Sequence, residues 1–499
     1  MITDLYQITM AQSYWKAGRA NMECVFHMFF RKHPFHGGYT VASGLGPFVD
    51  WLKRFHTSES DIAYLSSLTG NDGKPLFEAG FLAYLSTLNS GLHLDIDAVP
   101  EGTIVFPNEP LIRVRGPIVE AQLLETAMLC LVNFHTLVAT KAARVVRSAS
   151  AQLGAPDAEP AALAPVLEFG LRRAQGVDGG VAATRASYVG GCCATSNVLA
   201  GKLYGIPVKG THAHSWVQSF GAGEAAAFRA YAEACPNNCV FLVDTYDTVQ
   251  GVEHAIEVGR ELRAKGFELA GIRLDSGDLA WLSKRAREML DAAGFPKASV
   301  YASNDLDEHL IRSLKIQGAP IGVWGVGTKL VTCYDQPALG GVYKLAALKE
   351  PGEAVWRHAI KLSEMAIKVS TPGILNARRF RVGKEFVGDV IYDVLTKVPE
   401  SWKAVDPADV TRVKVFPEEA ESEDLLVPIM REGKLVWKEP PLAEVRQRVQ
   451  DQLAMFHPGI KRLENPHEYP CGLEESLYDL KIKLIQKEKE KVRLEKEKK

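Results

Sequence analysis

Two histidines separated by a single residue are the most chemically suggestive feature of this sequence. His212 and His214 flank Ala213 within the segment Thr-His-Ala-His-Ser at 211–215. On a strand, alternate residues share a face, so this spacing could bind a metal ion as in barrel hydrolases. An imidazole held by a carboxylate can instead accept a phosphoryl group. A structural pair in the core is the third interpretation, and spacing alone leaves all three open.

A second candidate group follows in Arg273-Leu-Asp275-Ser-Gly-Asp278. Arg273 and Asp275 are two residues apart, so on a strand their side chains point to the same side. The arginine could grip a carboxylate or a phosphate, and the aspartate could hold ribose hydroxyls or orient a metal ion. A structural ion pair between them is the alternative. Asp244 and Asp275 are also possible carboxylate partners for a histidine.

Glycines 325 and 327, in Gly-Val-Gly-Thr at 325–328, could form a phosphate cradle. Glycines let backbone N–H groups approach an anion, and a helix that begins there adds a favourable dipole. The motif is neither a P-loop nor a dinucleotide fingerprint, so a plain turn from strand to helix remains the alternative.

The elements around these residues predict a barrel of strands and helices. Between about 165 and 345, apolar runs alternate with amphipathic stretches, which is typical of parallel strands joined by helices. The runs are 165–170, 205–210, 239–244, 269–275, 299–304 and 321–327. Polar side chains follow each run, and in a closed barrel all strand ends meet at one mouth that holds the active site. Helix capping would explain Asp278 and Asp305, but not Arg273 or the histidines.

The rest of the chain predicts one flanking domain built from both ends. Strand and turn patterns occur before the barrel and again after it. We therefore expect an α/β protein with flanking α+β segments at 1–130 and 346–440 around a barrel at 131–345. A helical extension is expected at 441–499, and its Lys/Glu-rich end is predicted to be a solvated helix because its charges are interleaved.

Composition narrows the class of protein. The chain has 499 residues, 46% of them hydrophobic and 24% charged, with a formal charge of -2. Nothing in this balance favours nucleic-acid binding, and no apolar run reaches the roughly 20 residues needed to cross a bilayer. The first residues lack the layout of a signal peptide, so we expect a cytosolic enzyme. Cys235 and Cys239 lack a second pair to complete a zinc site, and we expect all eight cysteines to be free thiols.

Five motifs, in order, resemble the nicotinate phosphoribosyltransferase family. They are Asp-Leu-Tyr-Gln-Ile-Thr-Met at 4–10, Glu-Phe-Gly-Leu-Arg-Arg-Ala-Gln-Gly at 168–176, Gly-Thr-His-Ala-His-Ser at 210–215, Gly-Ile-Arg-Leu-Asp-Ser-Gly-Asp at 271–278 and Gly-Val-Gly-Thr at 325–328. The resemblance extends from residue 1 to about 440. It implies an irregular barrel of the type II phosphoribosyltransferase kind, acting as a homodimer.

The resemblance also implies the reaction and the residues that perform it. Nicotinate and 5-phosphoribosyl 1-diphosphate would give nicotinate mononucleotide and diphosphate, coupled to ATP hydrolysis, in NAD biosynthesis from nicotinate. In this family the second histidine of the Thr-His-Ala-His-Ser segment, here His214, is phosphorylated, and Asp244 and Asp275 would be catalytic. The expected nicotinate-binding residues are Tyr6, Phe169, Thr211 and Arg273. The expected residues for phosphoribosyl diphosphate are Arg172, Gly325, Gly327 and Thr328.

The chemistry of these residues agrees with that reaction. Nicotinate is a flat anion, which suits an aromatic face and a guanidinium. Loss of diphosphate builds oxocarbenium-like charge that Asp275 could stabilise. Mg²⁺, or Mn²⁺, would be held mostly by the diphosphate, so no dedicated protein cage is expected. The remaining hypotheses are a sister enzyme for nicotinamide or quinolinate, a metal hydrolase and an inactive scaffold.

Overall fold

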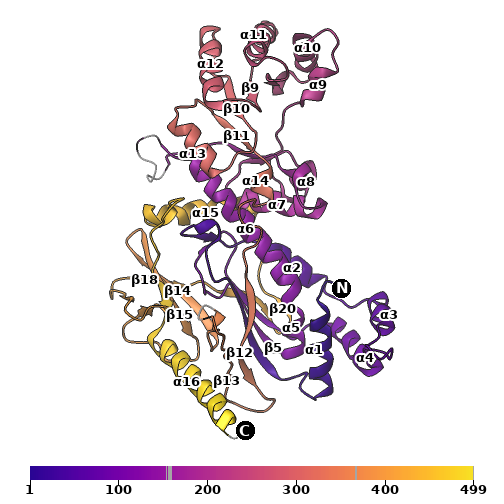
Figure 1. The fold of residues 1–499 in the computed structure, drawn as a ribbon, viewed down its shortest axis with the longest axis vertical. Helices are drawn as coiled ribbons and strands as arrows, with labels where there is room; N and C mark the ends of the chain where they lie inside the picture. The colour runs from indigo at the N-terminus through magenta and orange to yellow at the C-terminus, as the bar shows by residue number, and fades with distance from the viewer. Residues whose placement is uncertain (153, 155–159, 366–367, 498–499) are drawn as a thin grey trace.

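A six-stranded parallel sheet forms the centre of the upper half of the molecule (Figure 1). The computed structural model describes residues 1–152, 154, 160–365 and 368–497. The strand order is β7 (Ala194–Thr195), β6 (Val166–Glu168), β11 (Val323–Val326), β10 (Ser299–Ala302), β9 (Gly271–Leu274) and β8 (Val240–Leu242). Five of the six predicted runs are therefore strands of one curved parallel sheet, as the barrel prediction requires.

The run at 205–210 differs from the prediction. It makes a single parallel bridge, between Val208 and Thr195 of β7. The preceding helix, α8 (Val198–Tyr204), ends at Gly205 in the left-handed conformation, with φ of 67°. Pro207 follows, and it has no N–H to donate to a ladder. The segment is thus too short and too interrupted to form a regular strand.

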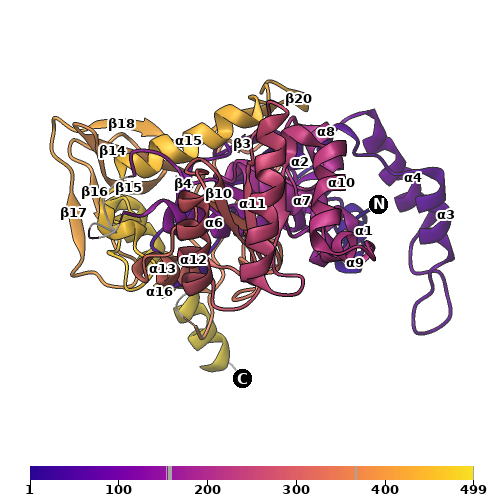
Figure 2. The ribbon, with the colours of Figure 1, turned by 90° about the horizontal axis from the view of Figure 1, so that it is seen from above.

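The helices between these strands cover the outside of the sheet. They include α7 (Val177–Val189), α10 (Glu224–Ala234), α11 (Thr248–Ala264), α12 (Leu279–Ala292) and α13 (Glu308–Ile316). Helices α10, α11 and α12 lie on the side turned away from the rest of the molecule (Figures 1 and 2). Asp278 caps α12, as predicted, by accepting from the N–H groups of Ala280 and Trp281. For α13 the prediction was wrong: Asp307, not Asp305, is the capping residue.

The flanking domain contains strands from both ends of the chain. Its seven-stranded sheet has the order β13 (Arg357–His358), β12 (Val342–Lys349), β1 (Glu23–Phe29), β5 (Ile112–Pro117), β3 (Asp95–Ala98), β19 (Val427–Arg431) and β20 (Lys434–Leu435). A second sheet has the order β17 (Val413–Val415), β16 (Lys403–Val405), β21 (Cys471–Leu473), β15 (Glu385–Asp393), β14 (Leu375–Val382) and β18 (Glu421–Asp424). A small pair joins β2 (Thr40–Val41) and β4 (Ile104–Val105). The predicted construction from both ends is confirmed.

Helices complete the flanking domain. They are α1 (Leu5–Lys16), α2 (Leu45–Lys53), α3 (Glu59–Ser67), α4 (Ala79–Thr87), α5 (Ile118–Leu123), α15 (Leu442–Met455) and α16 (Glu475–Glu497). The charged helix α16 packs near its start, where Leu477 is buried against Leu375 and Ile391. Its last turns are exposed, in agreement with the interleaved charges of the sequence.

Helix α6 (Glu125–Ser150) joins the two halves. Its first part packs into the core of the flanking domain through Met128 and Val132. Its last part packs into the core of the barrel through Val145 and Ala149. By length and composition this helix could span a membrane, but 72% of its most apolar window is buried inside the protein. Such burial is typical of a core helix.

A buried ion pair also links the two halves. The carboxylate of Glu101 accepts two hydrogen bonds from Arg185 of α7, at 2.8 and 2.7 Å, and one from the N–H of Gly44 before α2. Burial alone would raise the pKa of Glu101, but the Arg185 guanidinium lowers it to about 2. Gly44 has a φ of 99°, and a side chain there would meet the Leu131 carbonyl oxygen, so this glycine is required.

A second buried carboxylate, Glu109, has the opposite character. It accepts from the N–H of Phe106 and lies beside Asp389, which is paired with Arg379. Burial, and then the neighbouring Asp389 carboxylate, raise the pKa of Glu109 well above its usual range. Arg379 is therefore paired with Asp389, and Glu109 favours its protonated form.

Candidate active site

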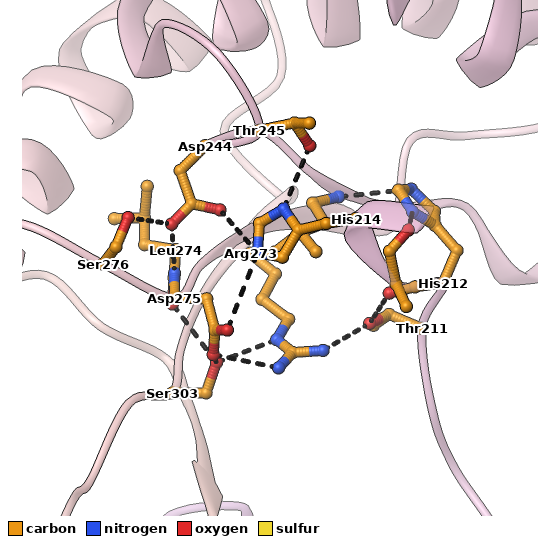
Figure 3. A network of polar contacts seen from close by, with 12 residues as sticks. Thr211, His212, His214, Asp244, Thr245, Arg273, Leu274, Asp275, Ser276 and Ser303 are labelled. Carbon is orange, nitrogen blue, oxygen red and sulfur yellow. Dashed lines mark hydrogen bonds and ion pairs between the residues drawn. The ribbon is translucent and has the colours of Figure 1, made fainter. Parts of the chain in front are cut away.

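Arg273 stands at the centre of the polar residues that meet at the carboxyl ends of the parallel strands (Figure 3). Its Nη1 donates to Thr211 Oγ1 at 3.0 Å, and its Nη2 donates to Asp275 Oδ1 at 3.0 Å. Its Nε donates to Ser303 Oγ at 2.8 Å. A guanidinium has five N–H donors, so each NH₂ group keeps one further N–H for a ligand. The Arg273 side chain is therefore held in place but can still donate two hydrogen bonds.

His214 is the first residue of α9 (His214–Gln218) and faces two carboxylates. Its Nδ1 lies 3.1 Å from Thr245 Oγ1. Its Nε2 lies 3.8 Å from Asp275 Oδ2 and 4.0 Å from Asp244 Oδ1. The side chain is 38% exposed, so a ligand in the mouth can reach it.

Asp244 is the buried member of this group, with only 1% of its side chain exposed. Its Oδ2 accepts from the N–H of Asp275 at 2.8 Å and from Ser276 Oγ at 2.6 Å. Its Oδ1 is buried and has no hydrogen-bond partner among the described residues. An unpaired buried acceptor is costly, so this oxygen is suited to stabilise a proton on the His214 ring.

His212 lies in a different environment. Its ring is buried among Phe228, Tyr231 and Phe241. Its Nε2 accepts from the N–H of Leu242 at 3.3 Å, and burial lowers the pKa of His212 to about 4. Within the described ranges, no group of three or more His, Cys, Asp or Glu side chains is arranged to hold a metal ion. His212 is engaged with Leu242 inside an aromatic enclosure, whereas His214 faces Asp244 and Asp275, so the two rings do not share one ligand site.

Phe169 gives the mouth an aromatic wall. It directly follows β6 and is half-buried, and Arg273 Cζ lies 5.5 Å from the centre of its ring. A side chain at Gly325 would come within 2.8 Å of that ring, and one at Gly327 within 3.2 Å of the Phe169 carbonyl oxygen. These glycines therefore make room for Phe169, a role that the sequence did not suggest. Glu168 fixes the turn by accepting from the N–H of Gly170.

The remaining predicted phosphate-binding residues lie on neighbouring segments. Thr328 is the first residue of the short helix α14 (Thr328–Val331), directly after β11. Lys329 pairs with Asp307, at 2.6 Å, which ties this turn to the start of α13. Arg172 lies in the 3₁₀ turn Leu171–Arg173 and is exposed. It has no hydrogen-bond or ion-pair partner in the described part of the chain, so it is free to meet an anion.

Comparisons with known proteins identify the family of this chain. The N-terminal and C-terminal domains of nicotinate phosphoribosyltransferase match residues 1–133 and 378–481. Nicotinate phosphoribosyltransferase of Bacillus subtilis is 43% identical over 98% of this chain and 96% of its own length. The chain belongs to the nicotinate phosphoribosyltransferase family. The human protein of that name is 35% identical over 96% of this chain and 95% of its own length. The crystal structure of human nicotinic acid phosphoribosyltransferase matches with a TM-score of 0.82 and 33% identity, covering 97% of this chain and 100% of that one.

Tyr6 is the one predicted site residue of this family member that lies far from the mouth. It is on α1 in the flanking domain, which lies apart from β9 and α9 of the barrel (Figure 1). Its side chain is 49% exposed, next to Leu5 and Met10, which are also exposed. Within one chain the structure therefore does not bring Tyr6 to the other site residues.

Three hydroxyl groups at the mouth were not among the predicted site residues. Ser303 contacts both Arg273 and Asp275, Thr245 contacts His214, and Ser276 contacts Asp244. Each directly follows a strand or a predicted acidic residue. This position in the sequence could have indicated that they belong to the site, but serine and threonine are too common after strands for the position alone to predict a functional role.

Proposed function

We propose that this chain joins nicotinate to 5-phosphoribosyl 1-diphosphate, with ATP hydrolysed through a phosphate carried by His214. Family membership supports the transferase reaction. The observation that carries the ATP-coupled form is the position of His214, an accessible imidazole facing Asp244 and Asp275 beside a fixed arginine. A nucleophilic histidine needs an acidic partner for its other nitrogen, and this geometry supplies one.

Nicotinate would bind between Arg273 and Phe169. The two free N–H groups of the guanidinium suit the nicotinate carboxylate, and the Phe169 ring suits its flat face. Thr211 holds the guanidinium in place through its hydroxyl. An arginine already engaged by three acceptors loses little entropy on binding, so the anion meets a prearranged partner.

In this proposal the proton of the His214 ring is on Nε2, which faces the two carboxylates. Nδ1 would then keep the lone pair, with the Thr245 hydroxyl as its hydrogen-bond donor. Transfer of the γ-phosphoryl group would form a bond from phosphorus to Nδ1 and break the bond to ADP. The resulting cationic ring would be stabilised by Asp244 and Asp275. Water would later release inorganic phosphate.

In the glycosyl transfer, the nicotinate nitrogen would bond to C1 of the ribose as the bond from C1 to diphosphate breaks. Asp275 Oδ2 would stabilise the positive charge that develops on the ribose. Arg172, the Gly325–Gly327 turn and Thr328 would contact phosphate groups. Mg²⁺ or Mn²⁺ bound to the diphosphate would neutralise the leaving group. Carboxylate oxygens of Asp244 and Asp275 are the hard ligands that such an ion accepts.

Tyr6 would act in the site of a second copy of the chain. It lies far from its own mouth, and it is exposed beside the apolar side chains of Leu5 and Met10. Exposed apolar groups of this kind are common at protein interfaces. A homodimer in which each α1 reaches the partner's mouth would satisfy both observations. We place the enzyme in the cytosol, where both substrates and ATP are available.

The test is nicotinate turnover with and without ATP, together with transfer of label from γ-labelled ATP. Label should appear on the wild-type protein in acid-labile form, and should be absent from His214→Ala. Full turnover by His214→Ala with undiminished stimulation by ATP would contradict the phosphohistidine. Nicotinamide and quinolinate should compete poorly, and a preference for the uncharged amide would contradict the role of Arg273.

A further inference from the structure

The parallel sheet is interrupted between β8 and the segment that follows Val208. On one edge, Val208 extends the sheet beyond β7 by a single bridge. On the other edge, the sheet ends at β8. The described strand pairings contain no ladder that joins these two edges. A closed barrel normally has such a ladder. The residues proposed for phosphate transfer and base binding, at 211–214, lie next to this gap.

Two side-chain contacts cross the gap in place of a ladder. Leu242 of β8 donates its N–H to His212 Nε2 at 3.3 Å, and Asn238 Nδ2 donates to the Gly210 carbonyl oxygen at 3.4 Å. The imidazole is only 8% exposed and is enclosed by Phe228, Tyr231 and Phe241. The ring is thus held firmly by packing while its nitrogen satisfies a strand N–H.

We infer that His212 is a positioning residue whose imidazole replaces the missing backbone ladder and thereby fixes Thr211 and His214 against β8. This inference rests on the proposed function, because it takes Thr211 and His214 as working residues. Thr211 precedes His212 and holds Arg273, and His214 follows it by two residues and contacts Thr245, three residues after Leu242. The hydrogen bond between Leu242 and His212 therefore lies between the contacts made by Thr211 and by His214, where it can hold both residues in place.

The chemistry of the ring agrees with this role. An N–H faces Nε2, so Nε2 must be an acceptor, and the proton of the neutral ring lies on Nδ1, 3.4 Å from the Ala213 carbonyl oxygen. Burial keeps the ring neutral by lowering the pKa of His212 to about 4. With Nε2 occupied and the ring enclosed, His212 is not available to carry phosphate. His212 is therefore the positioning histidine of the motif, and His214 is the one proposed to carry phosphate.

Two substitutions separate the hydrogen bond from the packing. His212→Phe fills the aromatic enclosure but removes the acceptor, whereas His212→Gln places an amide oxygen where Nε2 was. Small displacements of catalytic groups cost up to about 100-fold in rate. We expect His212→Phe to lower kcat/KM for nicotinate by about 10- to 100-fold and to slow labelling of His214. His212→Gln should recover most of both, and the KM for phosphoribosyl diphosphate should change little.

A second measurement keeps the inference separate from the proposed function. Hydrogen exchange at the Leu242 amide should be slow in the wild-type protein and in His212→Gln, and fast in His212→Phe. Equal exchange in wild type and His212→Phe would overturn the positioning role. So would wild-type kinetics in His212→Phe, or equal losses in both variants that follow their melting temperatures. If the wild-type protein turns over no nicotinate, the proposed function fails, and the exchange result still decides the role of His212.

Discussion

Replacing Gly325 by alanine tests how the aromatic wall of the mouth is set. A Cβ at this position would lie 2.8 Å from Cδ2 and 2.9 Å from Cε2 of Phe169, whereas ordinary contact begins at 3.4 Å. The difference, 3.4 minus 2.8, requires the ring to move by 0.6 Å. The backbone of β11 is held by β6 and β10 on either side, so we expect the half-buried ring to move instead, into the space proposed for nicotinate.

The size of the effect follows from the cost of overpacking. Inserting a methyl group into a packed contact typically costs about 1–3 kcal/mol. If this cost is met when the base binds, kcat/KM for nicotinate falls by about 5- to 150-fold. The phosphate contacts proposed for the Gly325–Gly327 turn and for Thr328 would be made by backbone N–H or hydroxyl groups, which the substitution leaves in place. The KM for phosphoribosyl diphosphate should therefore stay within about threefold of wild type.

The measurement is steady-state kinetics with each substrate varied in turn, which gives kcat and KM for nicotinate and for phosphoribosyl diphosphate separately. Gly179→Ala is the matched control, because a Cβ at this helical position meets nothing within 4 Å. It should leave both KM values unchanged and slightly stabilise α7. An unchanged nicotinate KM in Gly325→Ala would refute the steric argument. A rise only in the KM for phosphoribosyl diphosphate would show that Gly325 serves as a phosphate cradle instead.

Three further outcomes follow from the described contacts. Arg273→Lys should raise the KM for nicotinate by about 10- to 100-fold, because one ammonium cannot span three acceptors and a carboxylate; an equal loss with nicotinamide would contradict this. Glu101, with a lowered pKa, adds stability that is present above its unfolded pKa of about 4.5 and is lost as the pH falls toward 2. Glu109, with a raised pKa, binds a proton that the unfolded chain releases, so its contribution falls as the pH rises above about 4.5. Thermal melts from about pH 3 to 8 should therefore show the two effects in separate ranges. The difference between Glu101→Gln and wild type should change with pH only below about 4.5, and that of Glu109→Gln only above it; curves parallel to wild type throughout would contradict the assignment. Mixing inactive Tyr6→Ala with inactive His214→Ala should restore activity through mixed dimers, and no recovery would argue against a shared site.

The sequence predicted the barrel and its mouth well because parallel strands buried on both faces are apolar throughout and turn polar only where they end. Arg273, Asp275 and Asp244 were found in this way, and the structure brings them together with His214. The roles of His212 and Gly325 could not be predicted. They depend on Leu242 and Phe169, which are neighbours only in space.

Two local predictions were wrong, the capping residue of α13 and the strand at 205–210, because each depends on backbone conformation. Asp305 and Asp307 both precede α13, and only the backbone conformation decides which one caps it. Asp305 has a φ of 44°, in the left-handed region, whereas Asp307 has the extended backbone typical of a capping residue, with φ of -142° and ψ of 178°. The apolar residues of 205–210 are likewise typical of a strand. Gly205, however, has a left-handed backbone conformation, and Pro207 has no N–H to donate to a neighbouring strand.

The construction of the flanking sheet from both chain ends has a consequence for synthesis. β1 pairs with β5 on one side and with β12 on the other. β5 ends at residue 117 and β12 begins at residue 342, so the 224 residues from 118 to 341 must be made in between. At about 5–20 residues per second, the growing chain carries an unpaired apolar strand edge for roughly 10–45 s. Newly made chains are thus most prone to aggregate while the barrel is being translated, and a chaperone that shields β1 in that interval would raise the yield of active enzyme.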